Sequence, residues 1–197
     1  MQNEKEIHAE ASSRLIFYLG DERLLQMKQF IQHGDVSTYD HCLLVAYYSF
    51  LWMRKLHIRC SEDELIRGAL LHDYYLYDWH EKEKWHRMHG FRHPGFALSN
   101  AQRDFELSEK EKEIIRKHMW PLTIIPPTCR EAWIVNSADT FISLMETIAS
   151  RKRFGKMKEY WIHRPLRAMY DQSAKELVPV CIRARKLQMQ DPRCLFL

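Results

Sequence analysis

Apolar positions along the chain recur mostly at helical spacing, and short polar breaks separate the periodic segments. In the segment 39–56, Leu44, Tyr48 and Leu51 fall on one face, which is typical of an amphipathic helix. Further helices are predicted over residues 4–18, 22–32, 62–73, 94–103, 111–118, 130–150 and 157–189, the last broken near its prolines. The pattern contains no convincing strand, so the predicted fold class is all-α.

The predicted helix starts carry capping signals. Ser37 or Thr38 stands where the N-cap of the helix 39–56 is expected. Two further segments, 61–64 and 108–111, read as capping boxes, because a serine is followed three residues later by a glutamate. Pro94 suits the first residue of a helix. Each signal therefore predicts where a helix begins.

Composition narrows the class of protein. The 197 residues suit one domain with an appended segment, and 46% hydrophobic residues are typical of a folded chain. The net charge of +4 is compatible with an anionic substrate but too weak to indicate nucleic acid. The start of the chain is polar, and no apolar run reaches the ~20 residues of a membrane span. We therefore expect a cytoplasmic protein with no membrane partner.

Side chains of metal-ligand type stand at the ends or on the apolar faces of several predicted helices. His72 and Asp73 end an apolar helix, where an unpaired buried charge would cost several kcal/mol. His41 lies in the first turn of one apolar helix, and His118 ends another. Asp139 shares an apolar stripe. Each alone is more often a satisfied core residue than a ligand, but four such residues together favour a common metal site.

The order of these residues resembles that of the HD superfamily of metal-dependent phosphohydrolases, over roughly residues 38–147. The resemblance implies a helical bundle with a metal site between its helices. It assigns the metal ligands as His41, His72, Asp73, His93, His118 and Asp139. The chain is also similar to the bacterial HD proteins that hydrolyse dinucleoside tetraphosphates, which carry the same order of six ligands. His93 fits the third histidine better than His89, which has no small residue four positions later.

The resemblance also implies the chemistry. Two divalent ions are expected, iron, manganese or another metal, with Asp73 bridging them as the catalytic carboxylate. The expected reaction is hydrolysis of a phosphoester or phosphoanhydride, with a nucleotide as the expected type of substrate, by a metal-activated hydroxide. Rival functions are a mononuclear nucleotidase, an oxygen-activating di-iron enzyme and a non-catalytic nucleotide-binding module. A nucleic-acid binder is the weakest rival, and a homodimer stays open.

One departure concerns the residues that hold phosphate. Many family members follow the His-Asp pair with a Gly-Lys element, which is absent from residues 74–78. Arg87, Arg92 and Lys117 are candidate replacements because they flank the proposed ligands, although each could equally be an exposed basic side chain. His89 is a candidate to face the substrate.

Two segments complete the predicted organisation. Residues 1–150 are expected to form the HD-type domain, and residues 151–197 a helical extension that packs on it. Residues 74–92 are aromatic, charged and aperiodic, and are expected to form a long loop with a functional role.

Overall fold

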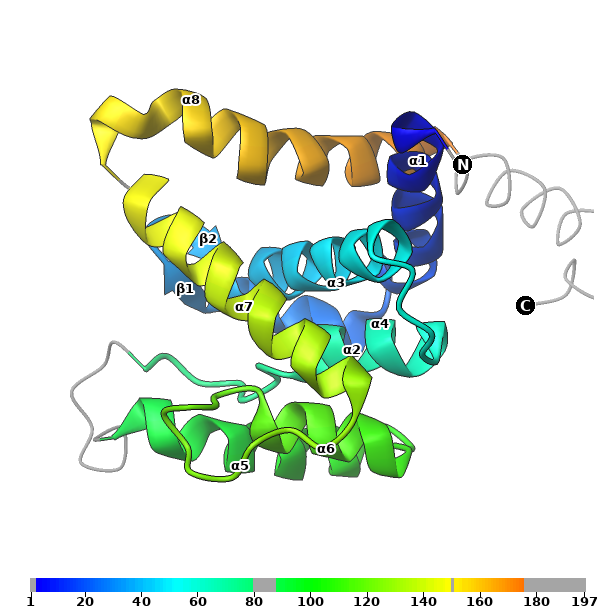
Figure 1. Ribbon diagram of the computed structural model, residues 1–197. Coiled ribbons are helices and arrows are strands. Elements are labelled where there is room, and N and C mark those ends of the chain that lie inside the picture. The colour runs from blue at the N-terminus through cyan, green and yellow to red at the C-terminus, as the bar shows by residue number, and fades with distance from the viewer. Residues whose placement is uncertain (1–2, 80–87, 150, 176–197) are drawn as a thin grey trace, which may run out of the picture.

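The computed structural model describes residues 3–79, 88–149 and 151–175, and nearly all of them belong to helices (Figure 1). In this view helical residues 155–175 lie above α3 (Thr38–Lys55), and α5 (His89–Asp104) and α6 (Glu109–Lys117) lie below it. Helix α7 (Arg130–Ala149) crosses in front of α3 and reaches from the upper layer to the lower one. The predicted all-α fold class is confirmed. Within the described residues, no helix combines the length and apolar character needed to cross a bilayer.

The N-terminal part begins as predicted but does not stay helical. Helix α1 spans Glu4–Leu15 and continues as a 3-10 turn, Ile16–Tyr18; α2 spans only Glu22–Leu25, before a second 3-10 turn, Gln26–Gln29. The expectation of a helix to residue 32 without any strand is wrong. Strands β1 (Ile31–His33) and β2 (Val36–Ser37) form an antiparallel hairpin instead. Gly34 adopts a positive φ of 66° at the turn, which glycine allows without a Cβ clash.

Helix α3 (Thr38–Lys55) is the centre of the bundle. Ser37 is its N-cap, since its hydroxyl accepts from the amide of Asp40 at 3.1 Å. Side chains on all sides of α3 are buried, because α1, α4, α7 and the C-terminal helix surround it. A helix that is apolar all round belongs in a core. Here this burial carries His41 into the interior.

Helices α4 (Glu62–Leu71) and α6 (Glu109–Lys117) approach closely at one point. A Cβ added to Gly68 would collide with the side chain of Ile114. His72 lies four residues after Gly68, and His118 lies four residues after Ile114. The same close approach therefore brings the two histidine rings to a centroid distance of 4.9 Å.

The capping predictions have mixed outcomes. The capping box at Ser108 is confirmed, with both reciprocal bonds to Glu111 present. Ser61 is the N-cap residue of α4, but its side chain accepts no capping bond, and its backbone N–H donates to Glu131 at 2.9 Å, so the box with Glu64 does not form.

Helix α5 (His89–Asp104) begins five residues earlier than predicted, so Pro94 lies inside it. The part of the expected loop that begins at His89 is therefore helical, and residues 80–87 lie outside the described part of the chain. His89 and His93 consequently stand one turn apart on the same helix.

After α6, the described residues form two long helices. Helix α7 spans Arg130–Ala149, close to the predicted range. A 3-10 turn, Lys152–Phe154, leads into α8 (Gly155–Lys158), a π-helical turn (Glu159–His163) and helical residues 164–175, which together we call the C-terminal helix. It packs on the bundle, with Tyr48 donating to the carbonyl of Trp161 at 3.0 Å. Tyr170 donates to Asp40 at 2.7 Å.

Candidate metal centre

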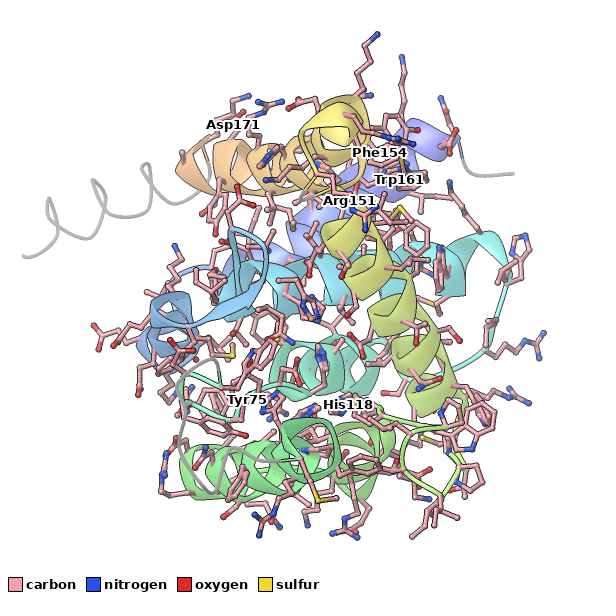
Figure 2. The ribbon with its side chains drawn as sticks, turned by 90° about the vertical axis from the view of Figure 1, so that its left-hand side faces the viewer. Tyr75, His118, Arg151, Phe154, Trp161 and Asp171 are labelled. Atoms are coloured by element: carbon pink, nitrogen blue, oxygen red, sulfur yellow. The ribbon has the colours of Figure 1, made fainter. Side chains whose placement is uncertain are left out.

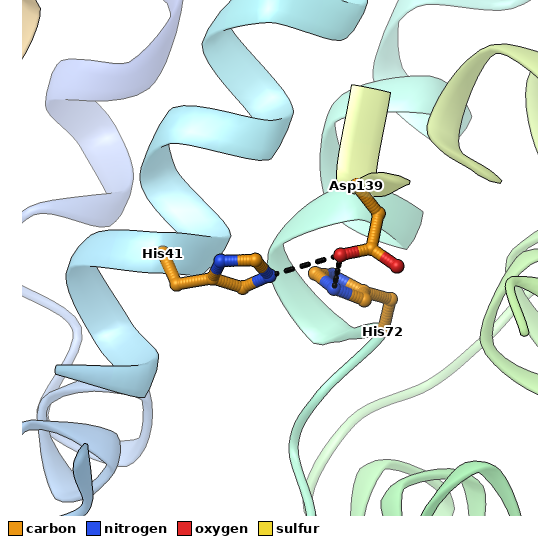
Figure 3. A group of neighbouring side chains, drawn as sticks. All are labelled: His41, His72 and Asp139. Atoms are coloured by element: carbon orange, nitrogen blue, oxygen red, sulfur yellow. Dashed lines mark hydrogen bonds and ion pairs between the residues drawn. The ribbon is translucent and has the colours of Figure 1, made fainter. Parts of the chain in front are cut away.

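Side chains from three helices meet in the interior below α3. His41 from α3, His72 at the end of α4 and Asp139 from α7 point toward one another (Figure 3). The Oδ1 atom of Asp139 lies 3.1 Å from His41 Nε2 and 3.7 Å from His72 Nε2. All three residues are buried. Their ligand atoms are close enough together to hold one metal ion.

Asp73 stands between this group and two further histidines. Its Oδ2 atom lies 3.6 Å from His72 Nε2 and 3.9 Å from His41 Nε2. Its Oδ1 atom faces the other way, 3.1 Å from His93 Nε2 and 3.4 Å from His118 Nε2. The structure therefore brings all six residues of the expected ligand set to one place, with one carboxylate between two histidine pairs.

The backbone fixes the tautomer of three of these histidines. The Nδ1 atom of His72 lies 2.7 Å from the carbonyl of Ala69, and that of His118 lies 2.9 Å from the carbonyl of Ile115. His93 Nδ1 contacts a carbonyl in the same way, at 3.1 Å. Because a carbonyl only accepts, each Nδ1 must carry the hydrogen. In the neutral ring the Nε2 lone pair is then free to point into the site.

These lone pairs require a cation. The Nε2 atoms of His93 and His118 lie only 2.8 Å apart, where two neutral acceptors would repel each other. His72 Nε2 and Asp73 Oδ1 are buried without a hydrogen bond from the described residues. Groups of this type are costly to bury unless an ion or proton matches them. The residues present therefore fit a divalent metal such as iron, manganese or zinc.

The pKa directions agree with a site that attracts positive charge. Burial alone would raise the pKa of Asp73, but the charge of His72 and the histidine contacts hold it well below the usual range. Burial likewise opposes ionisation of Asp139, yet its contacts with His41 and His72 lower its pKa. The pKa of His41 is raised despite burial, chiefly by the charge of Glu146.

Glu146 is a buried residue that the sequence reasoning missed. It lies on α7, two turns after Asp139, and both its oxygens lie 3.0–3.1 Å from His41 Nδ1. A carboxylate in this position fixes the tautomer and direction of a metal-binding imidazole and makes it a stronger ligand. The spacing of seven from Asp139 placed Glu146 on the same helix face and could have revealed it.

The hairpin supplies a second residue that the sequence reasoning missed. Gln32 on β1 donates from Nε2 to Asp73 Oδ2 at 2.6 Å. Its Oε1 atom accepts from Tyr75 and, at 3.3 Å, from Thr38, so the orientation of the amide is fixed. The neighbouring His33 is half-buried, with its ring 6.2 Å from that of His41. No helical periodicity could have placed these residues at the site.

A cavity of about 400 Å³ opens onto the metal centre. His89 lines it, as do His33, Trp79 and Trp120. The ring of His89 stacks between Trp79, at 5.1 Å, and His93, at 4.6 Å. His89 therefore lies in the wall of this cavity, and its contact with a substrate stays a prediction.

The basic candidates lie elsewhere. Lys117 forms an ion pair with Glu113 at 3.5 Å and lines a separate surface cavity. Arg92 is exposed and is not among the residues that line the metal-centre cavity. Arg87 lies outside the described residues. Their positions give no support to a role in holding phosphate, which stays a prediction.

The comparison with protein families identifies the class. The family model of the HD domain matches residues 38–144, which include all six residues of the metal centre. The chain therefore belongs to the HD domain family, most of whose members are metal-dependent hydrolases. Neither the comparison with curated proteins nor the comparison with solved structures found a match.

Proposed function

We propose that this protein is a phosphohydrolase that uses two divalent metal ions to cleave a phosphoester or phosphoanhydride of a nucleotide-type small molecule. His41, His72, Asp73 and Asp139 would hold one ion. His93 and His118 would hold the other, with Asp73 shared. This division of the ligands favours a site for two metal ions over the single-ion site of a mononuclear nucleotidase.

The observation that carries the proposal is the position of Asp73. Its two oxygens face different pairs of imidazole nitrogens, at 3.6–3.9 Å on one side and 3.1–3.4 Å on the other. A carboxylate that served a single ion would need ligands on one side only. Two metal ions placed here would lower the pKa of a shared water and neutralise the charge of a phosphoryl group.

The protein itself contributes orientation. Glu146 holds His41, backbone carbonyls hold the other three histidines, and Gln32 holds Asp73. Each ligand is therefore directed before an ion arrives, which reduces the reorganisation needed during reaction. Asn136 on α7 donates to the carbonyls of His118 and, at 2.6 Å, of Trp120, and so fixes the chain that follows α6.

The cavity walls support a substrate with a flat ring. Trp79, His89 and Trp120 line a space of about 400 Å³, within the size range of small-molecule sites. Aromatic walls of this kind stack on a nucleobase. Asp73 and Asp139 form the floor of the cavity, so a phosphate can approach only when metal ions offset their charge.

A phosphate-release screen tests the proposal. The full chain is stripped with a chelator, reloaded separately with Mn²⁺, Fe²⁺ or Zn²⁺, and incubated with nucleoside mono-, di- and triphosphates, dinucleoside polyphosphates and simple phosphoesters. We expect phosphate release that depends on the added metal and is lost again on chelation. The dinucleoside arm also tests the likeness to dinucleoside-tetraphosphate hydrolases.

The same screen separates the rivals. Oxygen consumption by the iron-loaded protein without phosphate release would establish the oxygenase reading. Nucleotides that raise the melting temperature but are not cleaved would establish the binding module. Release of phosphate at an equal rate from the metal-free chain would overturn the proposal.

A further inference from the structure

A second cavity lies further along α3 than the metal centre, beside the middle and the last turns of this helix. It has a volume of about 630 Å³ and is enclosed by α1, α3 and the C-terminal helix. It shares no lining residue with the cavity at the metal centre. Figure 2 shows the separation, with Trp161 near the top of the view and His118 near the bottom. We call it the Trp161 cavity.

Aromatic rings make up much of its wall. Tyr47, Tyr48 and Trp52 come from α3, and Tyr160 and Trp161 from the C-terminal helix. Tyr48 and Trp161 lie 6.0 Å apart, and Trp161 lies 4.9 Å from Tyr160 at a steep angle. Tyr160 is 55% exposed, although a large ring usually gains by burial. The wall therefore offers flat apolar faces that the protein itself leaves partly open.

Positive charge exceeds negative charge around these rings. Lys5, Lys55 and Arg164 line the cavity, against one carboxylate, that of Glu4. Glu4 is already engaged by Lys55 at 2.5 Å. No ion pair of Arg164 occurs within the part of the chain that the structure describes, and its guanidinium lies 6.0 Å from the Tyr160 ring. A guanidinium beside open rings suits an anion attached to a planar group.

His8 adds a neutral hydrogen-bonding group to the wall. Its Nδ1 atom lies 2.5 Å from the hydroxyl of Tyr47. Burial and the charge of Lys55 lower the pKa of His8, while Glu4 opposes this shift. The shift favours the neutral imidazole, which can accept a hydrogen bond from a polar group of a ligand or donate one to it.

We propose that the Trp161 cavity binds a planar aromatic ring that carries a phosphate, of the size of a nucleoside monophosphate. The rings of Trp52 and Trp161 would contact the base, and Arg164 the phosphate. The volume lies within the range of small-molecule sites. The proposal is independent of catalysis at the metal centre, because neither the rings nor the cations named here contact a proposed metal ligand.

The test is a titration of the metal-loaded full chain. The probe is the methylenephosphonate analogue of adenosine monophosphate, in which a CH₂ group replaces the bridging oxygen, so that the metal centre cannot hydrolyse it. Calorimetry counts the sites, and tryptophan fluorescence reports on Trp52 and Trp161 together with the tryptophans of the metal-centre cavity. We expect one site that quenches this fluorescence and that is weakened by the substitution of Arg164, besides any site at the metal centre. Adenosine, which lacks the anion, and ribose 5-phosphate, which lacks the ring, should each bind at least about tenfold more weakly.

Arg164→Gln locates the site. This exposed substitution should weaken binding at least about tenfold. Arg167→Gln is the matched control, since Arg167 is exposed on the same helix but pairs with Glu159 and does not line the cavity. Its binding should equal that of the unaltered protein. Two results would overturn the proposal: an unchanged affinity in Arg164→Gln, or no binding of the probe at millimolar concentration. If the probe bound only at the metal centre, Arg164→Gln would leave its affinity unchanged.

Discussion

The metal centre and the Trp161 cavity lie at different points along the same helix and differ in almost every physical respect. His41, in the first turn of α3, is fully buried and faces carboxylates, while Tyr47 and Tyr48, two turns later, face a partly open cavity. At the metal centre the unmatched groups are acceptors and negative charges. In the Trp161 cavity they are rings and positive charges.

The two regions differ in burial, and for this reason the metal centre indicates its ligand more strongly than the Trp161 cavity does. A buried lone pair or carboxylate without a partner costs free energy, so the convergence of the six ligand-type residues around such groups favours a cation at the metal centre. An exposed cation such as Arg164 is satisfied by water, so its position only permits an anion. The buried side chains of the metal centre therefore indicate the type of ligand that they bind. The ligand of the Trp161 cavity must be found by measuring binding.

The largest expected effect comes from Asp73→Asn. In the proposed two-metal site, an amide in place of the Asp73 carboxylate would remove the charge that both ions share. Metal ions supply several kcal/mol of transition-state stabilisation, so a loss of about 4 kcal/mol corresponds to about a 10³-fold slower phosphate release. Elemental analysis should show loss of both metals. The control is Asp63→Asn, an exposed acid in the first turn of α4; similar losses in the control would show a general effect on the fold.

Counting metals in single-histidine variants tests whether the centre is divided as Asp73 suggests. His93→Ala should lower the content from two ions per chain to one, since His93 faces only one oxygen of Asp73. His41→Ala should remove the other ion. Both proteins would be purified without added metal and measured by mass spectrometry. Two ions retained by His93→Ala would contradict the division and favour a mononuclear site.

Glu146→Gln should have an intermediate effect. The amide can no longer bind His41 Nδ1–H through two carboxylate oxygens, so the imidazole loses direction and basicity. Loss of such a partner costs about 10–100-fold in metal affinity. Affinity would be measured by competition with a chelator of known strength. Glu131→Gln is a matched control, because Glu131 is also buried on α7 but binds Ser61 and Lys110. It should lower the melting temperature without changing metal affinity.

The fold was largely predictable where periodicity and caps agree. The ranges of α3, α6 and α7 and the capping box at Ser108 follow from local sequence. The hairpin at residues 31–37 could not be predicted in this way, because two very short strands show no alternation. The start of α5 was also missed, since Pro94 reads as a first residue although the helix begins earlier. Tertiary packing decided both cases.

The site was predictable to the extent that its members are anomalies in their local sequence. A carboxylate on an apolar stripe, as at Asp139, signals a buried partner. Gln32 gave no such signal, since a glutamine before a turn is usually exposed. The signal of Glu146 was its spacing of seven from Asp139, which the sequence reasoning did not use. Gln32 contacts Asp73, which lies 41 residues away in the chain, and Glu146 contacts His41, which lies 105 residues away. Only the fold shows these contacts.

The smallest expected effect concerns a carboxylate that needs no metal. Burial opposes the ionisation of Glu113, but hydrogen bonds from Thr128 and Cys129 lower its pKa to about 2. Glu113 on α6 thereby caps the start of α7, the helix that carries Asp139. Replacement by glutamine should cost about 1 kcal/mol, as loss of a cap does, and lower the melting temperature by about 2–4 °C at pH 7.

The pH dependence of that effect has a defined sign. Because the folded pKa is depressed, the carboxylate stabilises the protein fully above the unfolded value of 4.5, and this contribution is lost as pH falls toward about 2. The difference in melting temperature between the unaltered protein and Glu113→Gln should therefore shrink steadily below pH 4.5. Glu106→Gln, an exposed substitution in the preceding loop, should show no difference at any pH. If the difference in melting temperature between the unaltered protein and Glu113→Gln is constant from pH 7 to pH 3, the charge of Glu113 is not the cause of the stabilisation. The substitution would then act through a poorer fit of the amide. In that case α7 would be held to α6 by packing alone, whereas the metal centre beneath it would still depend on charge.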